Sequence, residues 1–190
     1  MDVKEKNLIQ KKYMIDKETI ELMLTLCESK EVKKGDFLLR KGEPVGNIFV
    51  VVEGCVRTYV VDKKGKEHTI QFAQEGCTIG DYESLVDDTP ALLNIDALEN
   101  TKVVVFNKAD AQGSNIQLVQ IGSKLYHNQV WVLQKRVMEL LSGTADERYM
   151  EFVRVFPSLL NRVPQKMIAS YLGIAPESLS RVRNEIAKRK

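Results

Sequence analysis

The stretch that decides the fold of this chain is VPQKMIASYLGIAPESLSRVRNEI, residues 163–186. Apolar residues recur at helical spacing on both sides of Gly173, which stands where a tight turn between helices needs a left-handed backbone. Pro176 suits the first position of a second helix, because the N–H that proline lacks has no partner there. The positions expected to point inward are Ile168, Ala169, Leu172, Leu179, Val182 and Ile186. The sequence therefore predicts a helix-turn-helix.

The outer face of the second helix carries polar groups that suit nucleic acid. Arg can form two hydrogen bonds with guanine, Glu can accept one from cytosine, and Ser can reach a phosphate. These outer residues are Glu177, Ser178, Arg181, Asn184 and Lys188. Residues 158–190 hold seven Lys and Arg against two Asp and Glu, whereas the net charge of the whole chain is +2. A helical hairpin used only for packing explains the apolar residues equally well, but it does not explain this basic block, which favours DNA.

From about Ser114 to Ser142 the apolar residues follow the period of a long helix, in two stripes. One stripe is Leu118, Ile121, Leu125 and Val132, and the other is Val119, Tyr126, Val130, Leu133, Val137 and Leu140. A helix that is apolar on two faces needs two neighbours. The second stripe steps by seven, so we expect it to meet a second copy of the helix while the first covers the preceding domain. The alternative is one helix half-buried in a monomer.

A shorter helix is expected between this long helix and the helix-turn-helix. Thr144 and Glu147 have the spacing of a capping box, and Pro157 follows the expected end near Phe156. The last 30-odd residues are too few to form a core alone, so they must dock on the helix before them.

The N-terminal half has a different pattern, with short runs of Val, Ile and Phe punctuated by Gly. Six strands are predicted: 37–40, 48–53, 56–61, 68–73, 92–98 and 102–106. Residues 62–66 form the expected hairpin turn around Gly65, and residues 16–29 a helix that precedes the strands. Strands this close, with no helix between them, indicate an antiparallel sandwich or barrel. The expected fold class is α+β.

Composition excludes several classes of protein. The chain has 190 residues, no apolar run near the length of a membrane span, and an N-terminus too charged for a secretory signal. Its three cysteines are predicted to be reduced thiols in a cytoplasmic protein. His68 and His127 are isolated, so no metal or haem site is expected. No Ser-His-Asp set, P-loop, Rossmann fingerprint or cupin ligand cluster occurs, so the sequence predicts no enzyme.

Two blocks of motifs together resemble the Crp/Fnr family of bacterial transcription regulators over nearly the whole chain. In the strand region these are Gly35-Asp36, Lys41-Gly42-Glu43, residues 49–54, Gly65-Lys66-Glu67 and residues 76–81, and in the tail residues 168–174 and 176–181. The resemblance implies a cyclic-nucleotide-binding-like jelly roll, an antiparallel double-stranded β-helix, over 1–113. It further implies a central dimerisation helix over 114–142 and a helix-turn-helix domain over 143–190.

The resemblance also implies what the protein binds and how. It implies a cytoplasmic homodimer that reads a two-fold site in double-stranded DNA through helix 176–188, with half-sites about 10 bp apart, and RNA polymerase as a further partner. Glu177 and Arg181 are then the base readers. The other DNA contacts expected are Gln165, Lys166, Ser178, Asn184 and Lys188.

The effector pocket departs from the family pattern. The family's phosphate loop begins with Gly-Glu and ends near Arg-Ser or Arg-Thr, whereas this chain has Gly80-Asp81 and Leu93-Asn94. No Lys or Arg lies between Lys66 and Lys102, and eight acidic residues do, so a phosphate would meet repulsion. Trp131 falls near the position that would face the base. We therefore expect no cofactor and a degenerate or re-purposed pocket.

An alternative is a regulator that binds cyclic AMP or cyclic GMP through a non-standard phosphate contact. Three groups could then supply the contact: the side chain of Arg57, backbone N–H groups near 81–84, or a residue of the central helix. A last departure is that the sequence ends at Lys190, directly after the second helix, which leaves no residues for the family's β-hairpin wing. Fewer phosphate contacts and a shallower salt dependence are expected.

Overall fold

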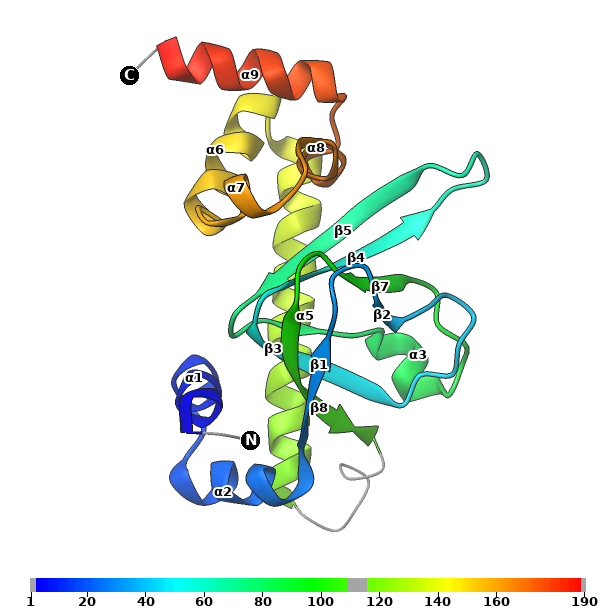
Figure 1. Ribbon diagram of the computed structural model, residues 1–190, viewed down its shortest axis with the longest axis vertical. Coiled ribbons are helices and arrows are strands. Elements are labelled where there is room, and N and C mark those ends of the chain that lie inside the picture. The colour runs from blue at the N-terminus through cyan, green and yellow to red at the C-terminus, as the bar shows by residue number, and fades with distance from the viewer. Residues whose placement is uncertain (1–2, 109–115, 189–190) are drawn as a thin grey trace. The chain divides into compact units, whose positions relative to one another are not determined.

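The computed structural model describes residues 3–108 and 116–188 (Figure 1). The expected helix start near Ser114 lies outside the described residues, and so does the end of the chain after Lys188.

The chain divides into two compact units. The first comprises Met1–Tyr59 and Phe72–Val130, and the second Val60–Gln71 and Trp131–Lys190. The long helix α5, Ile116–Ser142, contributes residues to both.

The first unit is built on two antiparallel sheets. One has the strand order β1-β8-β3-β6 and the other β2-β7-β4-β5. A jelly roll pairs strands that are far apart in sequence, as β1 pairs with β8 here. The expected antiparallel double-stranded β-helix is therefore confirmed. The strands are β1 (Glu28–Val32), β2 (Phe37–Leu39), β3 (Asn47–Glu53), β4 (Cys55–Val61), β5 (Glu67–Gln74), β6 (Thr78–Ile79), β7 (Asn94–Ala97) and β8 (Thr101–Asn107).

Strand β3 shows how the sheets are held together. Phe49 and Val51 enter the core between the two sheets, whereas Ile48, Val50 and Val52 belong to a second core under the helices. All five side chains are buried, because a strand turns successive residues to opposite faces and both faces are covered here.

Helix α5 supplies part of that second core. Ile121 and Leu125 are almost fully buried in it, as expected for the first apolar stripe, while the side chain of Leu118 lies outside the described residues. Val119 and Tyr126, from the second stripe, are half-exposed. Neither α5 nor any other helix described here is long and apolar enough to cross a membrane.

Several elements of this unit differ from those predicted from the sequence. The predicted helix over 16–29 ends earlier, because α2 covers Lys17–Leu26 and Glu28 already begins β1. The predicted strand over 92–98 is shorter, since β7 is Asn94–Ala97. Helices α1 (Val3–Tyr13) and α3 (Tyr82–Asp87) were not expected.

The second unit is helical, apart from the hairpin Val60–Gln71 between β4 and β5. The capping box at Thr144 is confirmed: its hydroxyl accepts a hydrogen bond from Glu147 N–H, and the Glu147 carboxylate accepts one from Thr144 N–H at 2.8 Å. This exchange lowers the pKa of Glu147. The helices that follow are α6 (Ala145–Val155), α7 (Leu159–Arg162), α8 (Gln165–Leu172) and α9 (Pro176–Lys188).

Candidate nucleic-acid interface

Helices α8 and α9 form the predicted helix-turn-helix. Gly173 has φ +66° and ψ +32°, the left-handed conformation expected of it, and Ile174 N–H donates to the carbonyl of Ala169 at 3.0 Å. A Cβ on Gly173 would also lie only 3.1 Å from Leu140 Cδ2. The left-handed backbone therefore favours glycine here, and a larger residue would also displace the Leu140 side chain of α5 slightly.

The inward face of the motif is the predicted one. Ala169 is fully buried, which fits a small residue where two helices cross closely. Ile186 and Ile174 are partly buried. The fully buried side chains of the motif are Ile168, Ala169, Leu172, Leu179 and Val182.

Aromatic side chains fasten this motif to α6 and α5. The Tyr171 ring lies 5.6 Å from Phe152 and 6.2 Å from Phe156, measured between ring centroids. On α5 the Arg136 guanidinium stacks over the same Tyr171 ring at 3.8 Å. Burial raises the pKa of Tyr171 to about 12. The core of the second unit thus fixes α8, and through the turn it fixes the start of α9.

The expected DNA contacts lie on the outside of α8 and α9. Glu177, Arg181, Asn184 and Lys188 are exposed along α9, and Lys166 is exposed in the first turn of α8. Ser178 and Gln165 are partly buried. The Arg181 guanidinium forms no hydrogen bond or ion pair within the described part of the chain, so it is available to bind a ligand.

A surface groove of about 550 Å³ runs beside these residues. It joins two expected contacts, Gln165 and Asn184, and adds Ser180 and Arg183, which the sequence analysis did not single out. Both residues lie on α9, but neither belongs to the outer face expected from the sequence. The basic charge of Arg183 was the signal that could have found it.

Two of the expected effector residues, Asp81 and Asn94, already accept hydrogen bonds from backbone N–H groups of the first unit. The buried Asp81 carboxylate accepts hydrogen bonds from Ser84 N–H at 3.3 Å and from Leu92 N–H at 2.8 Å. The Asn94 side-chain oxygen accepts one from Lys41 N–H at 3.0 Å. Gly80 is buried and Leu93 partly buried. An acidic side chain therefore already takes the backbone N–H groups that an anion would use.

Arg57 is neutralised in the same unit. Its Nε and Nη2 donate to the two oxygens of Asp96 at 3.0 and 2.8 Å, and its guanidinium stacks over the Tyr59 ring at 4.0 Å. The side chain is 3% exposed. Trp131, in the second unit, is 57% exposed. The Arg57 guanidinium already has a carboxylate partner, so it does not offer an unpaired charge to a cyclic phosphate.

Metal ligands are not gathered in the described residues: no three His, Cys, Asp or Glu side chains there are close enough to hold an ion. Cys27, Cys55 and Cys77 form no disulfide.

Comparison with known proteins supports the resemblance. The family model for the cyclic nucleotide-binding domain matches residues 29–113. The chain is 30% identical over 182 residues to the transcriptional activator protein Anr of Pseudomonas aeruginosa, an alignment that covers 86% of this chain and 74% of that protein.

Solved structures share the fold. FixK2 from Bradyrhizobium japonicum has a TM-score of 0.73 at 19% identity, covering 86% of this chain and 85% of its own. A Crp/Fnr-family regulator from Eubacterium rectale has a TM-score of 0.69 at 16% identity, covering 96% and 88%. With a relative at 30% identity, a matching family model and a helix-turn-helix that keeps its turn geometry, the chain belongs to the Crp/Fnr family of DNA-binding transcription regulators.

Proposed function

We propose that the protein recognises a two-fold DNA site by placing α9 in the major groove, with Glu177 and Arg181 reading bases. The observation that carries this proposal is the exposed outer face of α9, held at its start by the Gly173 turn and by buried Leu179 and Val182. Lys166, Gln165 and Ser178 would contact phosphates, and Asn184 and Lys188 extend the same face.

The test is selection of bound fragments from random and genomic DNA by the purified protein at a stated salt concentration. An enriched two-fold motif with half-sites about one helical turn apart is the expected result. Binding without enrichment, and equally weakened by salt for every sequence, would contradict base reading.

We further propose that functional domains follow the family arrangement, with a barrel over 1–113, a dimerisation helix over 114–142 and a reading domain over 143–190. Half-exposed apolar side chains at heptad spacing along α5 support a homodimer. They include Val119, Tyr126, Val130, Val137 and Leu140. Isolated apolar residues are common on surfaces, but a row of this length on one helix fits a coiled-coil partner.

Val137→Glu is expected to dissociate the dimer, because it would place two carboxylates against each other in the seam. Val137 is 52% exposed in the chain by itself, so the fold of the monomer should be unaffected. Sedimentation equilibrium measures the change, with the adjacent Arg136 left intact and His127→Glu, on another side of α5, as the control. A monomeric wild-type protein would refute the proposal.

The barrel is proposed to be a degenerate or re-purposed sensor. The contacts of Asp81 and the Arg57–Asp96 pair support this reading over a cyclic-nucleotide switch. Cyclic AMP and cyclic GMP are expected to leave the melting temperature unchanged. A ligand at 100 times its Kd would add about 2.7 kcal/mol, so binding would be seen in a thermal shift assay and would favour the alternative.

The remaining functions follow from DNA reading. The activator named among the relatives supports RNA polymerase as a further partner. A protein that reads bacterial DNA works in the cytoplasm, and no catalytic role is proposed.

A further inference from the structure

The hairpin between β4 and β5 carries three lysines at its tip: Lys63, Lys64 and Lys66. All three side chains are exposed, and none forms a hydrogen bond or ion pair within the described part of the chain. Two backbone hydrogen bonds close the turn, from Asp62 N–H to the Lys66 carbonyl at 2.9 Å and from Gly65 N–H to the Asp62 carbonyl at 3.0 Å. The three ammonium groups therefore project from a defined loop and are available to a partner outside the chain.

The acidic side chain at the tip is used by the turn itself. The Asp62 carboxylate accepts hydrogen bonds from the backbone N–H groups of Lys64 at 2.8 Å and Lys66 at 3.0 Å. Its other oxygen lies 2.8 Å from His68 Nε2, and the His68 contact together with these N–H groups lowers the pKa of Asp62 to about 2. Asp62 thus stabilises the turn and forms no ion pair with a lysine side chain of the tip.

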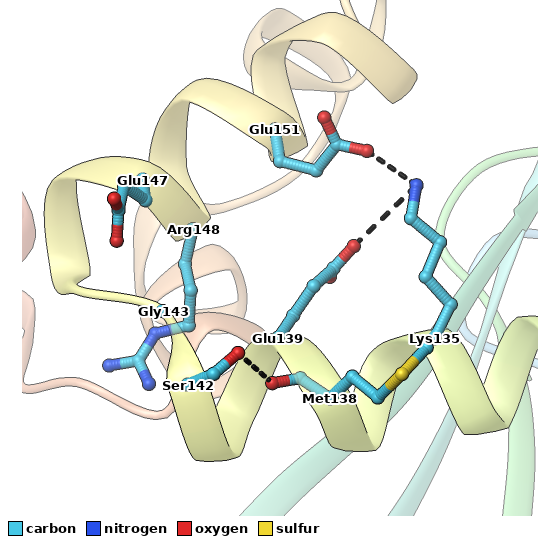
Figure 2. Close-up of a pocket in the computed structure, with 8 residues that line it drawn as sticks. All are labelled: Lys135, Met138, Glu139, Ser142, Gly143, Glu147, Arg148 and Glu151. Atoms are coloured by element: carbon cyan, nitrogen blue, oxygen red, sulfur yellow. Dashed lines mark hydrogen bonds and ion pairs between the residues drawn. The ribbon is translucent and has the colours of Figure 1, made fainter.

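Several basic side chains on the helices of the second unit are, by contrast, paired with carboxylates. Figure 2 shows Lys135 of α5 directed toward Glu139 and Glu151, and its Nζ lies 3.6 Å from a Glu139 oxygen. Glu151 also accepts two hydrogen bonds from Arg154, at 2.6 and 2.7 Å. The lysines of the hairpin differ from these helix residues, because their charge is not compensated in this way.

Charge is unequally divided between the two units. The second unit, Val60–Gln71 with Trp131–Lys190, holds fourteen Lys and Arg against eight Asp and Glu, whereas the first unit holds fourteen against eighteen. The hairpin therefore belongs to the basic unit, the same one that contains α8 and α9. A basic surface of this kind favours an anionic partner.

Ser170 attaches the hairpin to a particular face of α8. Its hydroxyl accepts a hydrogen bond from Thr69 N–H at 2.9 Å and donates one to the Glu67 carbonyl at 3.2 Å. Residues four apart lie on one face of a helix, so Ser170 shares its face with Lys166, an expected phosphate contact. A strand rises about 3.3 Å per residue, so the lysines of the tip lie within about 10 Å of this attachment along the hairpin.

We propose that the lysines at the tip of the β4–β5 hairpin bind the phosphate backbone of the DNA that flanks the site read by α9. The proposal rests on the proposed reading of DNA and adds a contact outside the helix-turn-helix. Lysine is a flexible point charge, which suits contacts with phosphates that carry no sequence information. DNA carries one negative charge per about 1.7 Å of helix axis, so three ammonium groups on one loop would meet several phosphates together.

The test compares the wild type with the triple variant Lys63→Gln, Lys64→Gln and Lys66→Gln by fluorescence anisotropy over a series of salt concentrations. One duplex carries the selected site and extends a full helical turn beyond each half-site, and the other is a random sequence of the same length. We expect the variant to bind both duplexes about tenfold or more weakly at about 50 mM salt, with the salt slope reduced by about 0.9 for each lysine that contacts a phosphate. The ratio of the two affinities should remain that of the wild type.

A matched control removes the same charge from the first unit. Lys30→Gln, Lys33→Gln and Lys34→Gln together change three exposed lysines, and DNA binding should remain close to that of the wild type. An equal loss in both triple variants would reveal a general effect of net charge. Unchanged binding in the hairpin variant would mean that the tip serves another partner, such as an acidic protein surface. Either result would overturn the proposal.

The two duplexes keep this proposal separate from base reading. Phosphate contacts do not depend on sequence, so the random duplex reports the contribution of the hairpin even if no site is selected. Base reading is instead reported by the preference between the duplexes, which Arg181→Ala should reduce and the hairpin variant should leave unchanged. A hairpin variant that lost preference while still binding the random duplex like the wild type would also contradict the proposal.

Discussion

Asp96→Asn is expected to lower the free energy of unfolding by about 3 kcal/mol, since removing one partner of a buried ion pair leaves the other charge uncompensated. The Arg57 side chain is 3% exposed and Asp96 14%, and both oxygens of Asp96 accept hydrogen bonds from the guanidinium. The substitution keeps the size of the side chain, so the loss reports the charge. Chemical denaturation followed by circular dichroism measures it.

Two further variants show whether the loss of stability comes from the buried charge. Glu21→Gln removes an exposed partner of Lys6, 3.7 Å away, and should change stability by less than about 1 kcal/mol. Arg57→Met combined with Asp96→Leu should recover most of the loss, because it removes both charges together. If Asp96→Asn cost no more than Glu21→Gln, the pair would not be buried as described.

Arg181→Ala is expected to weaken binding to the selected DNA site by about 1–3 kcal/mol per half-site and to relax base preference there. Arg181 is exposed on α9 and makes no contact within the described residues that would hold it back, so its loss should leave the fold unchanged. Fluorescence anisotropy with the selected site and with base-substituted sites measures both effects.

Lys166→Ala is the matched control for that experiment. It removes a charge from the first turn of α8, where a phosphate contact is expected, and should weaken all sequences alike while reducing the salt slope by about 1. An Arg181→Ala protein that lost affinity equally for random DNA would show that Arg181 acts as a phosphate contact instead.

Local rules were sufficient to predict the helix-turn-helix. Gly173, Pro176 and the capping box at Thr144 each act over one turn of chain, so their residue types carry the structure. The β-branched runs of β3 and β8 were likewise recognisable. Strand β1 was missed because its sequence is ESKEV, which is polar and mostly exposed, and it is held by its pairing with β8 some 70 residues away. The preceding helix was therefore extended too far.

The site was less predictable where it depends on pairing across the fold. The cyclic-nucleotide alternative offered Arg57 as a possible phosphate contact, but the register places Arg57 opposite Asp96, 39 residues away in the sequence. Periodicity gives the face of a residue and not its partner. The groove beside Ser180 and Arg183, and the meeting of Arg136 with Tyr171, likewise arise only when helices from separate segments pack together.

The hairpin between β4 and β5 belongs to the helical unit for a specific reason. Thr69 N–H donates to Ser170 Oγ of α8 at 2.9 Å, and the same hydroxyl donates to the Glu67 carbonyl at 3.2 Å. A single hydroxyl of the helix-turn-helix thus forms hydrogen bonds with two backbone groups of β5. The amide proton of Thr69 should consequently exchange slowly with solvent while α8 stays in place and rapidly once α8 moves. The exchange rate of this one amide would therefore report the position of α8 directly.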